Sequence, residues 1–301
     1  MPKTILISGA SSGFGALTAR ALADAGHTVY AGMRDIDRRN ATQAEKAQRY
    51  AKDNQVELRP VELDVTSESS VDDTLWTVLS EQNRLDVLVH NAEHVVTGPA
   101  EAFTPEQLAA LYDTSVLGAQ RINRAALPHM RHVGDGLLVW IGGLSTCGGA
   151  PPYLAPFSAT KAALAALAAS YAPELARWGI ETTIVVPGSL PHDTSHYAHV
   201  VSPDDDSVVA DYEEHHAGLQ AALGWGLTKI EPPDADVAEA IATVVDTPKG
   251  ERPLRVHVDS ADDRVTVADA VADRIRAKLL VRTGRDDLVH PRQPTPRIGH
   301  T

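Results

Sequence analysis

Short apolar runs alternate with longer segments of helical periodicity along most of the chain. The runs have the length of buried strands, and the segments between them place apolar residues three and four positions apart. Strands are predicted at 4–9, 27–32, 56–63, 85–90, 136–142, 180–186 and 254–258. Helices are predicted at 14–25, 37–53, 68–83, 104–132, 153–178, 234–246 and 262–283. Such alternation is typical of βαβ units, so it predicts an α/β fold with a doubly wound parallel sheet of about seven strands.

Two segments interrupt this rhythm. Residues 189–230 contain clusters of histidine, aspartate and proline, and we interpret them as an inserted substrate loop with short helices. The last residues contain Pro291, Pro294 and Pro296, which favour an extended surface arm. The expected organisation is one domain over residues 1–284 followed by a C-terminal tail over 285–301.

Composition narrows the class of protein. The chain has 301 residues, 43% of them hydrophobic, which is enough for one full core, and its formal net charge is −13. That charge argues against nucleic acid and anionic membrane as partners, since both favour a basic surface. The single cysteine, Cys147, is typical of a reducing compartment. No leader pattern and no apolar run of spanning length is present, so a cytoplasmic location is expected.

A glycine-rich turn follows the first predicted strand and opens the first helix. Residues 8–15 read SGASSGFG. Glycines at such a place allow a tight turn and a close approach of the backbone to a pyrophosphate, which the amino end of a helix attracts. The residues predicted to bind a nucleotide there are Gly9, Ser11, Ser12, Gly13, Phe14 and Gly15.

The GxxxGxG spacing resembles that of the short-chain dehydrogenases/reductases (SDRs), and the resemblance extends to about residue 260. The other matching landmarks are Asp64, Val65, Asn91, Lys161, Pro187 and Gly188. The resemblance implies a Rossmann-type fold in which Asp64 and Val65 hold an adenine ring and Lys161 holds the nicotinamide ribose. It also implies a homodimer or homotetramer, paired through the helices near 104–132 and 153–178.

The residue after the second predicted strand bears on the choice of cofactor. Arg34 lies where the adenosine ribose is expected, and a positive side chain there favours the 2′-phosphate of NADP(H). Asp35 follows directly and keeps NAD(H) open. A further possibility is that the glycine turn serves only helix packing and that no cofactor is retained.

Three of the four catalytic positions implied by the resemblance are substituted. SDR enzymes use asparagine, serine, tyrosine and lysine, of which only the lysine, Lys161, is present. The tyrosine position is Phe157, the asparagine position is Ser115 and the serine position is Gly143. Phenylalanine has no proton to donate, so ordinary carbonyl reduction loses general-acid catalysis worth about 10² to 10⁴ in rate. Ser145 lies near the usual serine spacing and could substitute in part.

Glu93 stands where the family has a glycine beside the cofactor. It either blocks the nicotinamide end of the pocket, takes over acid–base chemistry, or faces solvent. Because Lys161 matches a position at the same site, we predict a Glu93–Lys161 pair in place of the lost proton relay.

Other polar and aromatic residues are weaker candidates. Tyr153 precedes Phe157 by four residues at the start of the same predicted helix, so both can project to one side. Tyr153 could then supply a phenol from a shifted position, although a packing role is favoured. Cys147 is a possible but unsupported nucleophile. The expected substrate pocket comprises Phe157, Leu190, His192, His196 and Tyr197. The histidine spacings there are compatible with a metal, but solvated or pocket-lining histidines are favoured and no metal site is predicted.

Three functions remain open at this point. The favoured one is an SDR-fold enzyme that performs non-redox acid–base chemistry, namely cyclisation, isomerisation or elimination, on a small carbonyl-bearing metabolite. The second is an NADP(H)-dependent oxidoreductase with a rearranged proton donor, Tyr153 or Ser145. The third is a non-catalytic protein that binds a nucleotide or metabolite.

Overall fold

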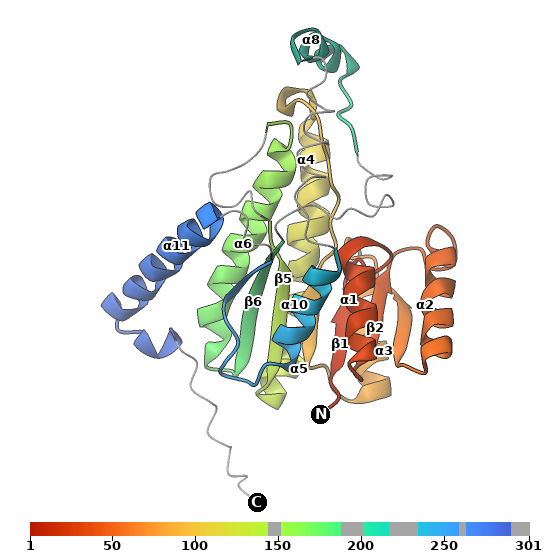
Figure 1. The fold of residues 1–301 in the computed structure, drawn as a ribbon, viewed down its shortest axis with the longest axis vertical. Coiled ribbons are helices and arrows are strands. Elements are labelled where there is room, and N and C mark those ends of the chain that lie inside the picture. Colours follow the sequence, from red (N-terminus) through yellow and green to blue (C-terminus); the bar gives the residue numbers. More distant parts are fainter. Residues whose placement is uncertain (144–151, 188–200, 217–233, 259–262, 290–301) are drawn as a thin grey trace, which may run out of the picture.

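The computed structural model describes residues 1–143, 152–187, 201–216, 234–258 and 263–289. A seven-stranded sheet runs through its centre, with helices on both faces (Figure 1). The strands are β1 (Thr4–Ile7), β2 (Thr28–Met33), β3 (Leu58–Glu62), β4 (Val87–His90), β5 (Gly136–Ile141), β6 (Ile180–Pro187) and β7 (Arg255–Val258). All neighbouring strands pair in parallel. The predicted doubly wound parallel sheet is confirmed.

The strand order places a crevice at the middle of the sheet. The order is β3-β2-β1-β4-β5-β6-β7, so the winding direction reverses between β1 and β4. In open α/β sheets, ligands bind at the carboxyl ends of the strands beside this reversal. The glycine turn after β1 and the residues after β4 therefore meet at the place where a ligand site is expected.

The helices cover the sheet in two layers. The described helices are α1 (Gly13–Asp24), α2 (Ala41–Asn54), α3 (Glu68–Gln82), α4 (Pro105–Tyr112), α5 (Gly118–Val133), α6 (Ala155–Ala176), α8 (Asp206–His216), α10 (Asp234–Asp246) and α11 (Asp263–Arg282). Side chains from α1, α2 and α10 form one hydrophobic core with one face of the sheet. Side chains from α3, α5 and α6 form the second core on the other face. Within the described residues, no helix is long and apolar enough to cross a membrane.

Two predicted helices have different boundaries in the structure. The helix predicted at 104–132 is divided into α4 and α5 by a turn of π-helix, Asp113–Leu117. A π turn inserts an extra residue into the helical hydrogen-bond pattern and is common at functional sites. The helix predicted from residue 37 begins only at Ala41, because Asp35 has a left-handed backbone with φ 53° and the chain turns before α2.

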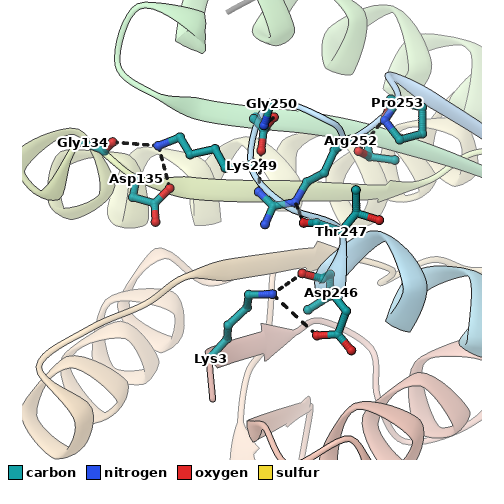
Figure 2. Close-up of polar contacts among 12 residues, drawn as sticks. Lys3, Gly134, Asp135, Asp246, Thr247, Lys249, Gly250, Arg252 and Pro253 are labelled. Atoms are coloured by element: carbon teal, nitrogen blue, oxygen red, sulfur yellow. Dashed lines mark hydrogen bonds and ion pairs between the residues drawn. The ribbon is translucent and has the colours of Figure 1, made fainter. Parts of the chain in front are cut away.

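A polar cluster fastens the amino ends of the strands, opposite the ligand crevice (Figure 2). Lys3 forms an ion pair with Asp246 at the end of α10, at 3.7 Å. Lys249 donates to Asp135 at 2.8 Å and to the carbonyl oxygen of Gly134 at 3.1 Å. These contacts join the turn after α10 to the starts of β1 and β5. They lie at the edge of the sheet opposite the carboxyl ends of the strands, where the ligand site is expected.

The predicted tail begins with a structured contact. A short 3₁₀ turn, Asp286–Leu288, follows α11, and Asp287 accepts a hydrogen bond from Arg177 Nε at 2.9 Å. Residues 290–301 lie outside the described ranges, as do residues 189–200 and 217–230 of the predicted substrate loop.

Candidate functional site

The turn after β1 can accommodate only glycine at two positions. Gly9 has φ +68°, and a Cβ atom there would lie 2.8 Å from the Cα of Ala92. A Cβ at Gly15 would lie 2.4 Å from Nδ2 of Asn91. Side chains larger than hydrogen would therefore push the turn away from the end of β4. The glycines are required for this close contact whether or not a nucleotide binds.

Hydrogen bonds join the glycine turn to the end of β4. Asn91 Nδ2 donates to the carbonyl oxygens of Ser8 at 3.1 Å and Gly9 at 2.9 Å. The Ser8 hydroxyl accepts from the backbone N–H groups of Asn91 at 3.0 Å and Ala92 at 3.1 Å. Asn91 thus fixes the shape of the turn, and it also lines the adjoining pocket.

One pocket extends from this turn along the carboxyl ends of β1 to β4. Its wall includes the predicted residues Gly9, Ser11, Ser12, Phe14, Arg34, Asp64, Val65, Asn91 and Glu93. It also includes Arg39, Asn40 and Gln43, which the sequence analysis did not identify. Arg39 and Asn40 directly precede α2, and Gln43 lies in its first turn. Asn40 donates a hydrogen bond to the carbonyl oxygen of Arg34. Two arginines at one end of the pocket form a suitable place for a phosphate group.

The turn that carries Arg34 is held by a glutamate from the next strand. Both oxygens of the Glu62 carboxylate accept hydrogen bonds, from the backbone N–H groups of Asp35 and Ile36, each at 2.9 Å. The Asp35 carboxylate lies 3.6 Å from Arg38. Among the described residues that line the pocket, Arg34 is present and Asp35 is not. The Asp35 carboxylate, which left NAD(H) as an alternative cofactor, therefore lies near Arg38 and does not line the pocket.

Glu93, which lines the pocket, forms an ion pair with Lys161, which is not among the described lining residues. The two side chains form a direct ion pair between Oε2 and Nζ, with only 9% of the Glu93 side chain and 5% of the Lys161 side chain exposed. Lys161 Nζ also donates to the carbonyl oxygen of Ile141 at 2.9 Å. The contact predicted for Glu93 and Lys161 is present, and the Glu93 carboxylate is directed to Lys161 and not out to solvent. Its catalytic role stays a prediction.

Comparison with known proteins identifies the family to which this chain belongs. The family model described as short chain dehydrogenase matches residues 3–200. The chain belongs to the short-chain dehydrogenase family. This assignment confirms the resemblance inferred from the glycine turn and from the landmarks at Asp64, Asn91 and Lys161.

Relatives within the SDR family carry the names of reductases and dehydrogenases. A 3-ketodihydrosphingosine reductase of Bacteroides thetaiotaomicron is 33% identical over 191 residues, which are 63% of this chain and 64% of that protein. Retinol dehydrogenase 8 of Homo sapiens is 32% identical over 192 residues, covering 63% of this chain and 59% of the relative. The matched region thus spans less than two thirds of the length of these two relatives.

Solved structures of two dehydrogenases match over most of the chain. A short-chain dehydrogenase from Streptomyces avermitilis has a TM-score of 0.73 at 29% identity and covers 95% of this chain and 98% of its own. An alcohol dehydrogenase from the archaeon Thermococcus sibiricus, complexed with 5-hydroxy-NADP, has a TM-score of 0.68 at 25% identity. It covers 87% of this chain and 97% of its own.

The SDR tyrosine position is occupied by a buried phenyl ring. Phe157 packs with Val95, Val96, Phe103 and Leu111 in a separate apolar cluster. Its ring centroid lies 5.6 Å from Lys161 Nζ, so the lysine contacts the ring face but finds no hydroxyl there. The structure thus places Phe157 beside Lys161, where the sequence comparison predicted it.

The other two substituted positions lie close to the same lysine or helix. Ser115 is buried within the π turn that separates α4 from α5. A Cβ added to Gly143 would lie 3.5 Å from Cγ of Lys161, an ordinary contact. A serine at 143 would therefore fit beside Lys161, so the missing serine hydroxyl has no steric cause in the described residues.

Tyr153 does not occupy the position expected from helical spacing. It precedes α6, which begins at Ala155, and it has a left-handed backbone with φ 67°. Its ring instead meets the edge of Tyr212 in α8, with the centroids 6.4 Å apart. The expectation that Tyr153 and Phe157 share a helix face is wrong, because the helix starts two residues after Tyr153.

Several predicted residues lie outside the described ranges. They are Ser145, Cys147, Gly188, Leu190, His192, His196 and Tyr197. Pro187, which precedes them, is the last residue of β6 and is buried. Gly13 is described and begins α1 with φ +53°.

The residues present fit one half of the SDR cofactor and not the other. The glycine turn, Asp64, Arg34 and Arg39 form a wall suited to an adenosine phosphate. Where the nicotinamide half is expected, Glu93 adds a carboxylate and forms an ion pair with Lys161, the residue expected to hold the nicotinamide ribose. We therefore derive no hydride-transfer step from this site.

Proposed function

We propose that this SDR-family protein is an enzyme that moves protons rather than hydride on a small carbonyl-bearing metabolite. The observation that carries the proposal is the buried ion pair between Glu93, which lines the pocket, and Lys161. A carboxylate is a suitable general base, and an ammonium group stabilises negative charge that develops on an oxygen. The pair supplies both in place of the tyrosine-centred relay.

The chemistry follows from the charges of the pair. Glu93 takes a proton from the carbon next to the substrate carbonyl, and the electron pair of that C–H bond moves toward the carbonyl oxygen. The positive charge of Lys161 stabilises the resulting enolate. Return of the proton to another atom of the substrate gives isomerisation, and loss of a leaving group at the neighbouring carbon gives elimination. Attack of the enolate on another group of the substrate gives cyclisation.

Lys161 has limited capacity for any other partner. An ammonium group has three N–H donors. One donates to the carbonyl oxygen of Ile141, and the Glu93 carboxylate attracts the same ammonium group through its charge. A donor that Ile141 does not take would serve a substrate oxygen. The buried Phe157 ring beside it provides a dry apolar wall, which strengthens the electrostatic effect of the pair on a bound substrate.

A nucleotide can still occupy the outer part of the pocket. Arg34 and Arg39 favour an adenosine carrying a ribose phosphate, so NADP(H) is the cofactor we propose if any nucleotide binds. Its adenosine half would lie on the glycine turn and order the pocket wall. No step of the proposed reaction requires the nicotinamide.

Solvent exchange tests the proposal. A panel of cyclic and open-chain ketones is incubated with the protein in D₂O without nucleotide, and deuterium uptake is followed by mass spectrometry. We expect wild type to accelerate uptake over Glu93→Gln by about 10² to 10⁴, the usual range for a general base. Lys161→Met should also lose the acceleration. Equal uptake with wild type and both variants would contradict the proposal, as would oxidation of NADPH by the same ketones.

The names of the relatives favour a second candidate function. The Bacteroides and human relatives are named as a reductase and a dehydrogenase, and the outer pocket has the residues for an adenosine phosphate. An NADP(H)-dependent oxidoreductase would need another proton donor, and Tyr153 and Ser145 are the candidates. NADPH consumption that is lost in Tyr153→Phe would support this function.

We also propose that the protein is cytoplasmic and forms a homodimer or homotetramer through α5 and α6. Large apolar side chains are exposed at Val133, the last residue of α5, and at Trp178, two residues after the end of α6. A solution mass near the single-chain value of 32.1 kDa would contradict the oligomer.

A further inference from the structure

Helix α11 turns a row of apolar side chains away from the protein. Val267, Val271, Ile275 and Leu279 are spaced four residues apart, and each is more than half exposed. Residues at i and i+4 are neighbours on one helix face, so the four side chains form a continuous row. A helix on a globular protein normally directs such a row into the core. The orientation of α11 is the reverse.

Ion pairs hold α11 in this orientation. Arg255 of β7 lies 3.0 Å from Asp273 and 3.5 Å from Asp269. His257 of β7 contacts Asp269 at 2.8 Å, and Asp269 is almost fully buried. The inner face of the helix is therefore the charged one, bound to the edge strand of the sheet. Turning the apolar row inward would bury hydrocarbon against these charges and break every one of the pairs.

A second row on the outward face is basic. Arg274, Lys278 and Arg282 follow the same four-residue spacing, directly beside the apolar row, and all three are exposed. Between residues 266 and 282 the only acidic side chains are Asp269 and Asp273, both paired on the inner side. The outward face of α11 is thus apolar and positive, on a chain whose formal net charge is −13.

The charge pattern decides which partner this face suits. Consider two copies of α11 that pack through their apolar rows. If a twofold axis relates them in antiparallel order, the basic row of one helix lies against the basic row of the other. A parallel pair sets the basic row against a flank without exposed acidic residues. Neither arrangement places a negative charge against the basic row. A partner surface that combines hydrocarbon with negative charge would match both rows.

We propose that the outward face of α11 binds the surface of a bilayer that contains anionic phospholipids. The helix lies along the interface, with the apolar row in the boundary between headgroups and acyl chains and the basic row against phosphate groups. The two rows run from Val267 to Arg282, which gives a contact length of about 24 Å. The net charge of the whole chain argued against an anionic membrane as a partner. Because charges are screened beyond about 10 Å, the charges on the outward face of α11 determine whether this face binds the membrane.

Sedimentation with lipid vesicles tests the proposal on the full chain. The probes are phosphatidylcholine vesicles with and without phosphatidylglycerol, at low and high salt. Ile275→Glu interrupts the apolar row, and Lys278→Glu reverses one charge of the basic row. The matched controls are Trp76→Glu and Lys46→Glu, which change an exposed apolar and an exposed basic side chain on other helices. Far-UV circular dichroism and the melting temperature check that each variant is folded.

We expect wild type to bind vesicles that contain phosphatidylglycerol, more weakly at high salt, and to bind phosphatidylcholine alone poorly. Each α11 variant should lower the partition coefficient by about tenfold, and the controls should leave it unchanged. Absence of wild-type binding would overturn the proposal, and so would binding that Ile275→Glu and Lys278→Glu do not weaken. Self-association lost in Ile275→Glu, without vesicle binding, would assign the face to a second copy and overturn it as well.

Discussion

The carboxylate of Glu93, which lines the ligand pocket, forms an ion pair with the ammonium group of Lys161, beside a phenyl ring where relatives of the family are expected to have a phenol. The two residues come from the end of β4 and from α6, nearly seventy positions apart in the chain. Lys161 contacts both substituted residues, because it pairs with Glu93, which replaces a glycine, and lies over the ring of Phe157, which replaces a tyrosine. These two substitutions distinguish this SDR site most clearly.

Breaking the pair should destabilise the fold. Glu93→Gln keeps the size of the side chain but leaves the buried Lys161 ammonium without its opposite charge. We expect a loss of about 3–5 kcal/mol in the free energy of unfolding, the usual cost of removing one partner of a buried pair. Urea denaturation measures it. The double variant Glu93→Gln/Lys161→Met removes the stranded charge and should recover part of the loss. A change in Glu93→Gln below about 0.5 kcal/mol, typical of a surface substitution, would show that the pair is not buried in solution.

The arginine after β2 should select nucleotides that carry a ribose phosphate. Arg34→Ala is expected to weaken binding of 2′,5′-ADP by about tenfold or more, because one charge-assisted contact to the phosphate is lost. Binding of 5′-ADP should not change. Isothermal titration measures both. Arg38→Ala is the matched control, since Arg38 lies against Asp35 and does not belong to the described pocket wall. Equal weakening of both nucleotides in Arg34→Ala would place Arg34 away from the ribose phosphate.

A buried histidine should make stability depend on pH. Complete burial lowers the pKa of His90 from its ordinary 6.5 to about 4, and its hydrogen bond to Asn123 offsets this only in part. Between pH 6.5 and about 4 the unfolded chain binds a proton here that the folded chain does not. Stability is therefore lost as the pH falls through this window, and the contribution stays constant above and below it.

The size of this effect follows from the two pKa values. From pH 7 to pH 5, His90 should remove about 2 kcal/mol of stability. The measurement is urea unfolding of wild type and His90→Asn at both pH values. Taking the difference between the two proteins cancels His27, whose pKa is also lowered by burial. A difference that is the same at both pH values would show that His90 titrates normally.

Tyr153 should be dispensable for proton transfer. Its ring meets the edge of the Tyr212 ring in α8, and its backbone carbonyl accepts a hydrogen bond from the N–H of Gly98 at 2.9 Å. We expect Tyr153→Phe to retain the exchange rate of wild type within about threefold, far less than the 10² to 10⁴ of a general acid. Loss of activity on that larger scale would identify Tyr153 as the proton donor and favour the oxidoreductase.

The sequence was sufficient to predict the sheet and the convergence of the two central residues. The position of Glu93 after β4 and the match of Lys161 to a family landmark put both at the carboxyl edge of a parallel sheet, where residues distant in the chain meet. The α/β alternation fixed the order of elements because each apolar run has the length of one strand.

Other parts of the site depend on local backbone geometry that periodicity does not encode. Arg39, Asn40 and Gln43 enter the pocket wall because Asp35 turns left-handed and Glu62 holds that turn through two backbone N–H groups. Tyr153 leaves the helix face of Phe157 for the same kind of reason, a left-handed residue just before α6. The π turn that contains Ser115 likewise interrupts a segment whose apolar pattern is continuous. Each depends on contacts made by residues from another part of the chain.

The most direct test of the proposed site is a titration of NADPH and 2′,5′-ADP against wild type and Glu93→Gly. Glu251→Gly, a change of an exposed glutamate in the loop before β7, is the matched control. We expect wild type to bind the two ligands with affinities within about threefold, because the nicotinamide half adds no contact past Glu93. Glu93→Gly should bind NADPH about tenfold more tightly, with 2′,5′-ADP unchanged. Wild type that already binds NADPH far more tightly than 2′,5′-ADP, with no gain in Glu93→Gly, would contradict a site converted from hydride transfer to proton transfer.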